Sequence, residues 1–233
     1  GHGAAAHEAE DFMVRDRFDR SAGMAVTLEQ AMARNGLSAE SLTHAELYSC
    51  FPCVPKLARR EIGWPLDRAA TVFGGLTFGG GPIGNYMSHA IASMVLALRR
   101  GAGGTGLLYA NGGYATHNHA IALGSAPFAD ASFPHKFDCQ SQADALRGPI
   151  PALEETYEGD ARIETFTVHY GRDGQPKSGV VVARTPTGTR TLARVATRDS
   201  AGIIALTDGR REPVGRAGAI HSAEDGLGGW SCT

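Results

Sequence analysis

A glycine-rich segment between regular patterns constrains this chain more than any other feature. Six of the eleven residues in Gly74–Gly84 are glycine. A short apolar run that is typical of a strand, Thr71–Phe73, precedes them, and a helical pattern, Asn85–Arg100, follows. The helical pattern has apolar residues three and four positions apart: Ile91, Met94, Val95 and Leu98. A second strand-like run, Gly106–Ala110, comes next, and strand, loop, helix and strand in this order predict an α/β fold.

The glycines come close to two phosphate-binding patterns and satisfy neither. Gly79–Gly84 reads G-x-G-x-x-G, but the dinucleotide fold also needs an acidic residue about 20 positions later. No Asp or Glu occurs from Arg68 to Ala129. A phosphate-binding P-loop is excluded because Asn85 and Tyr86 follow Gly84 in place of Lys and Ser or Thr. The backbone here either passes close to a ligand or a packed neighbour, or makes a tight structural crossover.

One further helix and a set of strands are predicted outside this region. Residues Gly23–Gly36 are helix-forming, with apolar positions at Val26, Leu28, Ala31 and Met32, and Asn35-Gly36 ends the pattern. Four runs in the last third alternate with turn signals: Arg162–Tyr170, Val180–Ala183, Thr191–Val195 and Gly202–Thr207. They predict a small antiparallel sheet or barrel.

These patterns divide the chain into an α/β part and a β part. The α/β part covers residues 1 to about 127. A proline-containing stretch, 128–153, is interpreted as an ordered linker without a core element. The β domain covers 154–218, and 219–233 is expected to be a tail.

Composition places the chain among ordinary globular proteins. It has 233 residues and a formal net charge of −2. No apolar run reaches the about 18 residues that a spanning helix needs, and the N-terminus lacks the basic and apolar regions of a secretory leader. We therefore expect no membrane span and a cytoplasmic location.

Metal binding is not expected. Cys50-x-x-Cys53 is compatible with a redox pair or half of a zinc site, but no second pair follows at the usual spacing, which favours a structural loop. His117-x-His119 alone favours hydrogen-bonded loop histidines over a metal site.

The stretch without acidic residues restricts the chemistry to histidine, tyrosine and cysteine. Carboxylate pairs and two-metal sites are excluded from this region. The proton-transfer groups within it are His89, His117, His119, Tyr86, Tyr109 and Tyr114. Tyr114–His119 follows a Gly-Gly turn at the end of a strand, where α/β proteins bind ligands.

Three segments together carry a resemblance to a known family. They are Glu46–Pro52, Gly74–Gly84 and Gly106–Tyr114. In this order and spacing they resemble the C-terminal half of the thiolase superfamily, in its lipid-transfer-protein-like and thiolase-like-protein branch, over about residues 10–127. Residues 150–216 resemble the additional C-terminal domain of such thiolase-like proteins, an oligonucleotide/oligosaccharide-binding (OB)-like barrel. The fold class expected is an α/β thiolase-like half followed by a small all-β, OB-like domain.

The resemblance also implies that the usual thiolase side chains are missing. Tyr48 stands where thiolases have the Asn of N-E-A-F, which orders a water. Gly81 replaces the His of G-H-P-x-G, and Ala110 replaces the Cys of C-x-G-G. The standard thiolase route lacks its acid and base here. The nucleophilic cysteine of the family belongs to the N-terminal half, and Cys50 and Cys53 do not replace it.

The function expected is therefore that of a degenerate, acyltransferase-like protein of lipid metabolism that binds a bulky acyl-CoA, with no other cofactor. A retro-aldol step would use Tyr48 and Tyr114 as acid and base, with Asn111 and His117 polarising the carbonyl. The resemblance also implies that seven residues bind the acyl substrate: Gly79, Gly80, Gly81, Gly84, Asn111, Gly112 and Gly113. We expect Tyr48, the glycine loop and Asn111–Tyr114 to converge, and Gly81→Phe to overpack the site.

A non-catalytic binding or scaffolding subunit is the alternative. Both hypotheses imply a partner polypeptide with the N-terminal thiolase half, and a homo- or hetero-oligomer. Nucleic acid is disfavoured, because residues 172–216 have nine Arg or Lys against four Asp or Glu but no aromatic residue on which bases could stack.

Overall fold

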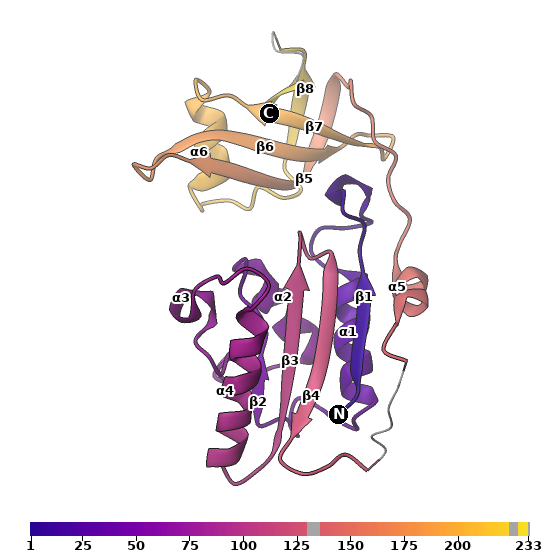
Figure 1. Cartoon of the computed structure of the whole chain (residues 1–233). Helices are drawn as coiled ribbons and strands as arrows, with labels where there is room; N and C mark the ends of the chain where they lie inside the picture. Colours follow the sequence, from indigo (N-terminus) through magenta and orange to yellow (C-terminus); the bar gives the residue numbers. More distant parts are fainter. Residues whose placement is uncertain (130–135, 224–227, 233) are drawn as a thin grey trace. The chain divides into compact units, whose positions relative to one another are not determined.

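The chain folds into two compact units. A computed structural model describes residues 1–129, 136–223 and 228–232 (Figure 1). Unit 1 comprises Gly1–Phe12 and Asp19–Gly148, and unit 2 comprises Met13–Phe18 and Pro149–Thr233. The chain therefore crosses between the units after Phe12, Phe18 and Gly148, with a short 3-10 helix, Phe12–Val14, at the first crossing.

Unit 1 is built on a mixed sheet of four strands in the order β1-β4-β3-β2. The strands are β1 (Gly3–His7), β2 (His44–Glu46), β3 (Thr105–Gly112) and β4 (His117–Gly124). β4 pairs antiparallel with both β1 and β3, whereas β2 runs parallel to β3. The parallel pair places the segments that follow β2 and β3 at the same edge of the sheet.

Helices cover both faces of this sheet. They are α1 (Ala22–Ala33), α2 (Cys53–Ile62), α3 (Gly75–Gly79), α4 (Tyr86–Arg100) and α5 (Gln140–Leu146). Leu107 packs in one core cluster with residues of α1 and α2, and its neighbour Leu108 packs in another with α4. Successive strand residues point to opposite faces, so β3 separates two cores. Figure 1 shows α4 and α1 on different sides of the strands.

Three of the predicted elements of unit 1 are confirmed. The helix predicted at 23–36 is α1, which begins where the Ser21 hydroxyl accepts a hydrogen bond from the Met24 amide (3.0 Å). The helix predicted at 85–100 is α4, and the run at 106–110 is β3. Met94 and Leu98 of α4 are buried within unit 1, so the apolar face of this helix is largely covered by its own sheet.

Other expectations for unit 1 were wrong. Thr71–Phe73 is not a strand, because the Thr71 hydroxyl accepts hydrogen bonds from the three amides that follow Val72. The histidines expected in a loop lie on β4. Cys53 is the first residue of a helix that the sequence reading missed, so only part of the C-x-x-C stretch is a loop.

The stretch interpreted as a linker contributes to the core of unit 1. Residues 130–135 lie outside the described residues, but Cys139 and Ala143 are fully buried in the same cluster as α1. Arg147 pairs with the buried carboxylate of Glu8 (2.9 Å). The expectation that the linker contains no core element was therefore wrong for the stretch that ends at Gly148, which belongs to unit 1.

Unit 2 contains a closed barrel of five strands in the order β5-β6-β7-β9-β8. The strands are β5 (Gly159–Tyr170), β6 (Pro176–Arg184), β7 (Arg190–Val195), β8 (Ala217–His221) and β9 (Gly228–Cys232). The first three were predicted. Gly202–Thr207, predicted as a strand, belongs instead to α6 (Ser200–Thr207), whose first turn is capped by the Asp199 carboxylate. β9 and most of β8 lie beyond residue 218, so the expectation of a tail was wrong there.

In the part of the chain that the structure describes, no helix has the length and apolar character needed to cross a membrane.

Candidate functional site

The ends of β2 and β3 form an open pocket of about 390 Å³ in unit 1. We call it the Tyr48 pocket; it is lined by Tyr48, Cys50, Phe51, Asn111, Gly112, Gly113 and Tyr114. The parallel pairing of Glu46 with Leu108 brings the two segments together. The structure thus unites two of the three segments expected to converge.

Tyr48 has an unusual backbone conformation at this pocket. Its φ of 46° lies in the left-handed region, which non-glycine residues seldom adopt. The ring contacts Tyr86 edge-on, with centroids 5.2 Å apart. Burial, followed by the neighbouring Cys50, raises the pKa of Tyr48. The phenol therefore keeps its proton at neutral pH and is a hydrogen-bond donor.

A buried carboxylate, Glu46, holds the surroundings of Tyr48 in place. The side chain is 1% exposed, and Oε1 accepts a hydrogen bond from the Tyr86 hydroxyl (2.9 Å). Oε2 accepts from the Thr71 hydroxyl (2.6 Å) and the Val72 amide (3.0 Å). Burial, followed by the charge of Glu46, raises the pKa of Tyr86 well above its ordinary range. One carboxylate thus connects β2, the start of the glycine-rich segment and α4.

Cys50 is the pocket residue that sequence reasoning set aside. Its Sγ donates to Asn111 Oδ1 at 3.6 Å. Burial is the main cause that raises the pKa of the thiol, so it is not a thiolate at neutral pH. The signal that could have found Cys50 is its position two residues after Tyr48.

Asn111 is buried, and its amide is engaged within the protein. Nδ2 donates to the Tyr109 hydroxyl (3.4 Å), the His117 carbonyl (3.3 Å) and Asn118 Oδ1 (3.3 Å). Two donor hydrogens are shared among three acceptors. Asn111 is therefore better suited to shaping the pocket than to polarising a substrate carbonyl.

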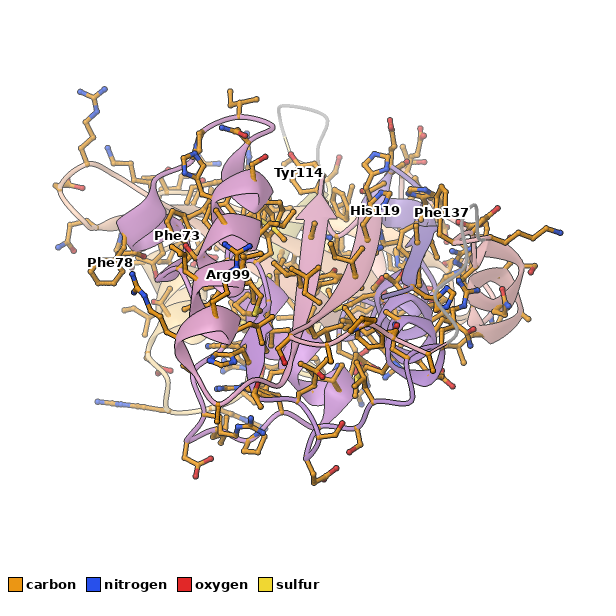
Figure 2. All side chains as sticks on the ribbon, turned by 60° about the horizontal axis from the view of Figure 1, so that its bottom comes forward. Phe73, Phe78, Arg99, Tyr114, His119 and Phe137 are labelled. Carbon is orange, nitrogen blue, oxygen red and sulfur yellow. The ribbon has the colours of Figure 1, made fainter. Side chains whose placement is uncertain are left out.

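Tyr114 lies at the mouth of the pocket. Its side chain is 66% exposed, and its ring stacks on Phe51 with centroids 6.4 Å apart. Figure 2 shows it beyond the end of β3. Gly113, with φ of 60°, makes the turn that directs Tyr114 there, and a Cβ at Gly113 would lie 2.9 Å from the Thr116 hydroxyl.

His117 does not line the pocket. It lies on β4 with His119, and both rings contact His7 of β1, with centroids 5.0 and 5.6 Å away. His117 Nδ1 is 3.1 Å from His7 Nδ1. Figure 2 shows His119 on the sheet face. Among the described residues, no group of three or more His, Cys, Asp or Glu side chains is arranged to hold a metal ion.

The glycine loop lies apart from the lining of the pocket. Gly79 ends α3, and none of Gly79, Gly80, Gly81 and Gly84 lines it. Only the start of the segment is connected to the site, through the Leu76 amide, which donates to the Ser49 hydroxyl (3.0 Å). A Cβ at Gly81 would have only Leu76 nearby, at 3.9 Å. The first carbon of a side chain therefore fits at Gly81, and the overpacking expected of Gly81→Phe stays a prediction.

The histidine cluster predicts an acid-sensitive stability of unit 1. Burial, and then the charges of His7 and His117, lower the pKa of His119. The unfolded chain, with a histidine pKa near 6.5, binds the proton more readily, so this contribution to stability is lost as pH falls through about 6.5. His119→Gln should reduce the fall in melting temperature between pH 7.5 and 5.5, measured by circular dichroism.

The matched control is His44→Gln, at β2 on the opposite edge of the sheet. It should leave the pH dependence close to that of the wild type. Equal slopes for His119→Gln and wild type would contradict the prediction.

Comparison with known proteins agrees with this architecture. The family described as the thiolase-like protein type 1 additional C-terminal domain matches residues 138–225. The chain is similar to the crystal structure of a monomeric SCP2-thiolase-like protein type 1 from Mycobacterium smegmatis, with a TM-score of 0.82 and 26% identity. The match covers 99% of this chain and 49% of that one, so this chain spans about half of its length. No curated protein matches the chain.

Residues 138–225 therefore match the additional C-terminal domain of thiolase-like proteins. The fold of the chain as a whole is similar to that of a thiolase-like protein.

Proposed function

We propose that the Tyr48 pocket binds the acyl group of a coenzyme A thioester and does not carry out standard thiolase chemistry. The observation that carries this proposal is a neutral hydrogen-bond donor at the pocket, the Tyr48 hydroxyl. Tyr48 keeps its proton, because burial raises its pKa. A thioester carbonyl is an acceptor that such a donor satisfies.

The expected loss of the thiolase acid and base also supports this proposal. By the resemblance, Ala110 and Gly81 stand at the positions of the family's Cys and His, and neither side chain can transfer a proton. Such groups each typically contribute about a hundredfold to ten-thousandfold to a rate. The proposal therefore expects binding without thiolysis of acetoacetyl-CoA.

A retro-aldol cleavage is the second candidate, and the two tyrosines of the pocket favour it. A base would take the proton of a β-hydroxyl group, the Cα–Cβ bond would break, and a carbonyl would form at Cβ. The electron pair of the broken bond would give the thioester enolate, which takes a proton from an acid. Tyr48 would be the acid, because it keeps its proton at neutral pH, and the exposed Tyr114 would be the base. His117, expected to assist, does not line the pocket.

Calorimetric titration of the full chain with octanoyl-CoA and with free CoA tests the binding proposal. The thioester should bind more tightly than CoA, and Tyr48→Phe should weaken its binding about fivefold, as expected for one neutral hydrogen bond. Tyr170→Phe, an exposed tyrosine of β5, is the matched control and should change nothing. Equal affinities for octanoyl-CoA and CoA would refute the proposal.

Incubation with 3-hydroxyoctanoyl-CoA separates the two candidates. Cleavage would give acetyl-CoA and hexanal, which mass spectrometry detects, and Tyr114→Phe should abolish it with little change in affinity. A binding protein should leave the ester intact.

The proposal includes a partner polypeptide with the N-terminal thiolase half and an oligomeric assembly. Its support is that the chain spans about half of the compared protein. The compared protein itself is described as monomeric.

A further inference from the structure

A second cavity of unit 1 lies beside α2 and shares no lining residue with the Tyr48 pocket. Its volume is about 580 Å³, within the range of small-molecule sites. We call it the α2 pocket. Its lining has an apolar part, formed by Pro52, Pro55, Trp64, Leu66 and Ala70, and a cationic part, formed by Lys56, Arg59 and Arg60.

The apolar part is built on a fixed indole ring. Trp64 is 4% exposed, and its Nε1 donates to the Ala69 carbonyl (3.0 Å). The Arg68 guanidinium lies over the ring, 3.7 Å from its centroid, and is held by the Ala39 carbonyl (3.0 Å). The ring therefore needs no reordering to receive a ligand, which lowers the cost of binding.

Leu66 leaves an apolar surface in water at the edge of this pocket. Its side chain is 87% exposed although it lies two residues after the buried Trp64. A ligand with an apolar body would cover Leu66 and so remove apolar area from water.

The cationic part has one charge that the fold does not use. Arg59 donates to the Arg68 carbonyl, and Arg60 donates to the Asp19 carbonyl. Both lie in the last turn of α2, where positive charge also stabilises the helix. Lys56 is exposed in mid-helix, and no hydrogen bond or ion pair with the described residues engages its ammonium group.

Charge complementarity decides the kind of ligand. The lining contains three cationic side chains and no carboxylate. Glu61 is paired with Arg20 (3.0 Å), and neither Glu61 nor Asp67, which follows Leu66, lines the pocket. An anion near Lys56 would meet no repulsion from the walls.

We propose that the α2 pocket binds a small amphipathic anion, with its apolar chain on Trp64 and Leu66 and its anionic head at Lys56. A medium-chain carboxylate is the simplest ligand of this class, and an alkyl phosphate shares its chemistry. This site is separate from the thioester site and does not depend on it.

The test titrates the full chain with decanoate, decyl phosphate, decanol and decyltrimethylammonium, below micelle-forming concentrations, by calorimetry. Decanoate or decyl phosphate should bind about tenfold more tightly than decanol, as expected for one charge-assisted contact. The cationic amphiphile should bind least. Equal binding of the four compounds would overturn the proposal.

Substitutions at two exposed positions test the location of the site, and neither is expected to destabilise the fold. Lys56→Gln should reduce the affinity for the anions to that for decanol, and Leu66→Ala should weaken all three anionic and neutral ligands. Tyr114→Phe, in the other pocket, should change none of these affinities. Decanoate binding that responds to Tyr114→Phe and not to Lys56→Gln would assign the ligand to the Tyr48 pocket and refute this inference.

Discussion

Arg190→Met is expected to destabilise unit 2 by about 3–5 kcal/mol, the usual cost of breaking a buried ion pair. The Arg190 side chain is fully buried and donates twice to Glu164 (2.9 and 2.8 Å). It also donates to the Met13 (2.5 Å) and Arg15 (2.7 Å) carbonyls. Methionine fills a similar volume but removes this donor from the two carbonyls and leaves Glu164 paired with Arg184 alone (2.9 Å).

Chemical denaturation followed by fluorescence measures this effect, because the two tryptophans of the chain, Trp64 and Trp230, report on different units. The transition of Trp230 should move to lower denaturant, while that of Trp64 moves less. Arg172→Met, in the exposed turn between β5 and β6, is the control and should stay within about 0.5 kcal/mol of wild type. An unchanged Trp230 transition in Arg190→Met would show that the buried pair is dispensable.

Glu46→Leu should destabilise unit 1 by about 3 kcal/mol and abolish thioester binding. Leucine leaves the Val72 amide, the Thr71 hydroxyl and the Tyr86 hydroxyl without their shared acceptor. Tyr86 would then no longer be held against Tyr48. Thermal unfolding and octanoyl-CoA titration measure the two effects.

Glu46→Gln makes the test specific. Its carbonyl oxygen can still accept from Val72 and Thr71, and its amide can donate to the Tyr86 hydroxyl, so the loss of stability should be smaller than for leucine. Glu29→Leu, on the exposed face of α1, is the control and should have little effect. If the Glu46→Leu protein binds the thioester like wild type, the Glu46 carboxylate is not required for binding at the Tyr48 pocket.

The elements that the sequence predicted well have local signals of their own. Apolar residues three and four positions apart mark α4, and Asn35-Gly36 marks the end of α1, most of whose residues are buried. Turn signals bound β5, β6 and β7. The side chains of β4 alternate between buried and exposed. However, the polar Asn118 points into the core and the apolar Ile121 points outward with His119, so the polarity of the sequence does not reveal the strand. β1 consists mostly of alanine and is a strand through its pairing with β4. These two strands depend on tertiary partners, which local patterns do not reveal.

The site was predictable in part for a similar reason. Parallel strands end at one edge, so the meeting of Tyr48 with Asn111–Tyr114 follows from topology. His117 is separated from this pocket because of the side of β4 on which it lies. The sequence analysis expected a loop at His117, and a loop does not predict the side of a sheet on which a residue lies. The distance of Gly81 from the lining depends on α3, a five-residue helix that forms within the glycine-rich segment.

The brief passage of the chain through unit 2 at Met13–Phe18 has a consequence for dissecting this protein. A truncation after Gly148 would remove the barrel but keep this hexapeptide, together with the Met13 and Arg15 carbonyls that Arg190 binds. An isolated barrel that starts at Pro149 would conversely lack these acceptors for a buried guanidinium. Neither unit can therefore be excised at a single cut, and a separable version of the barrel must carry residues 13–18 grafted or supplied as a peptide.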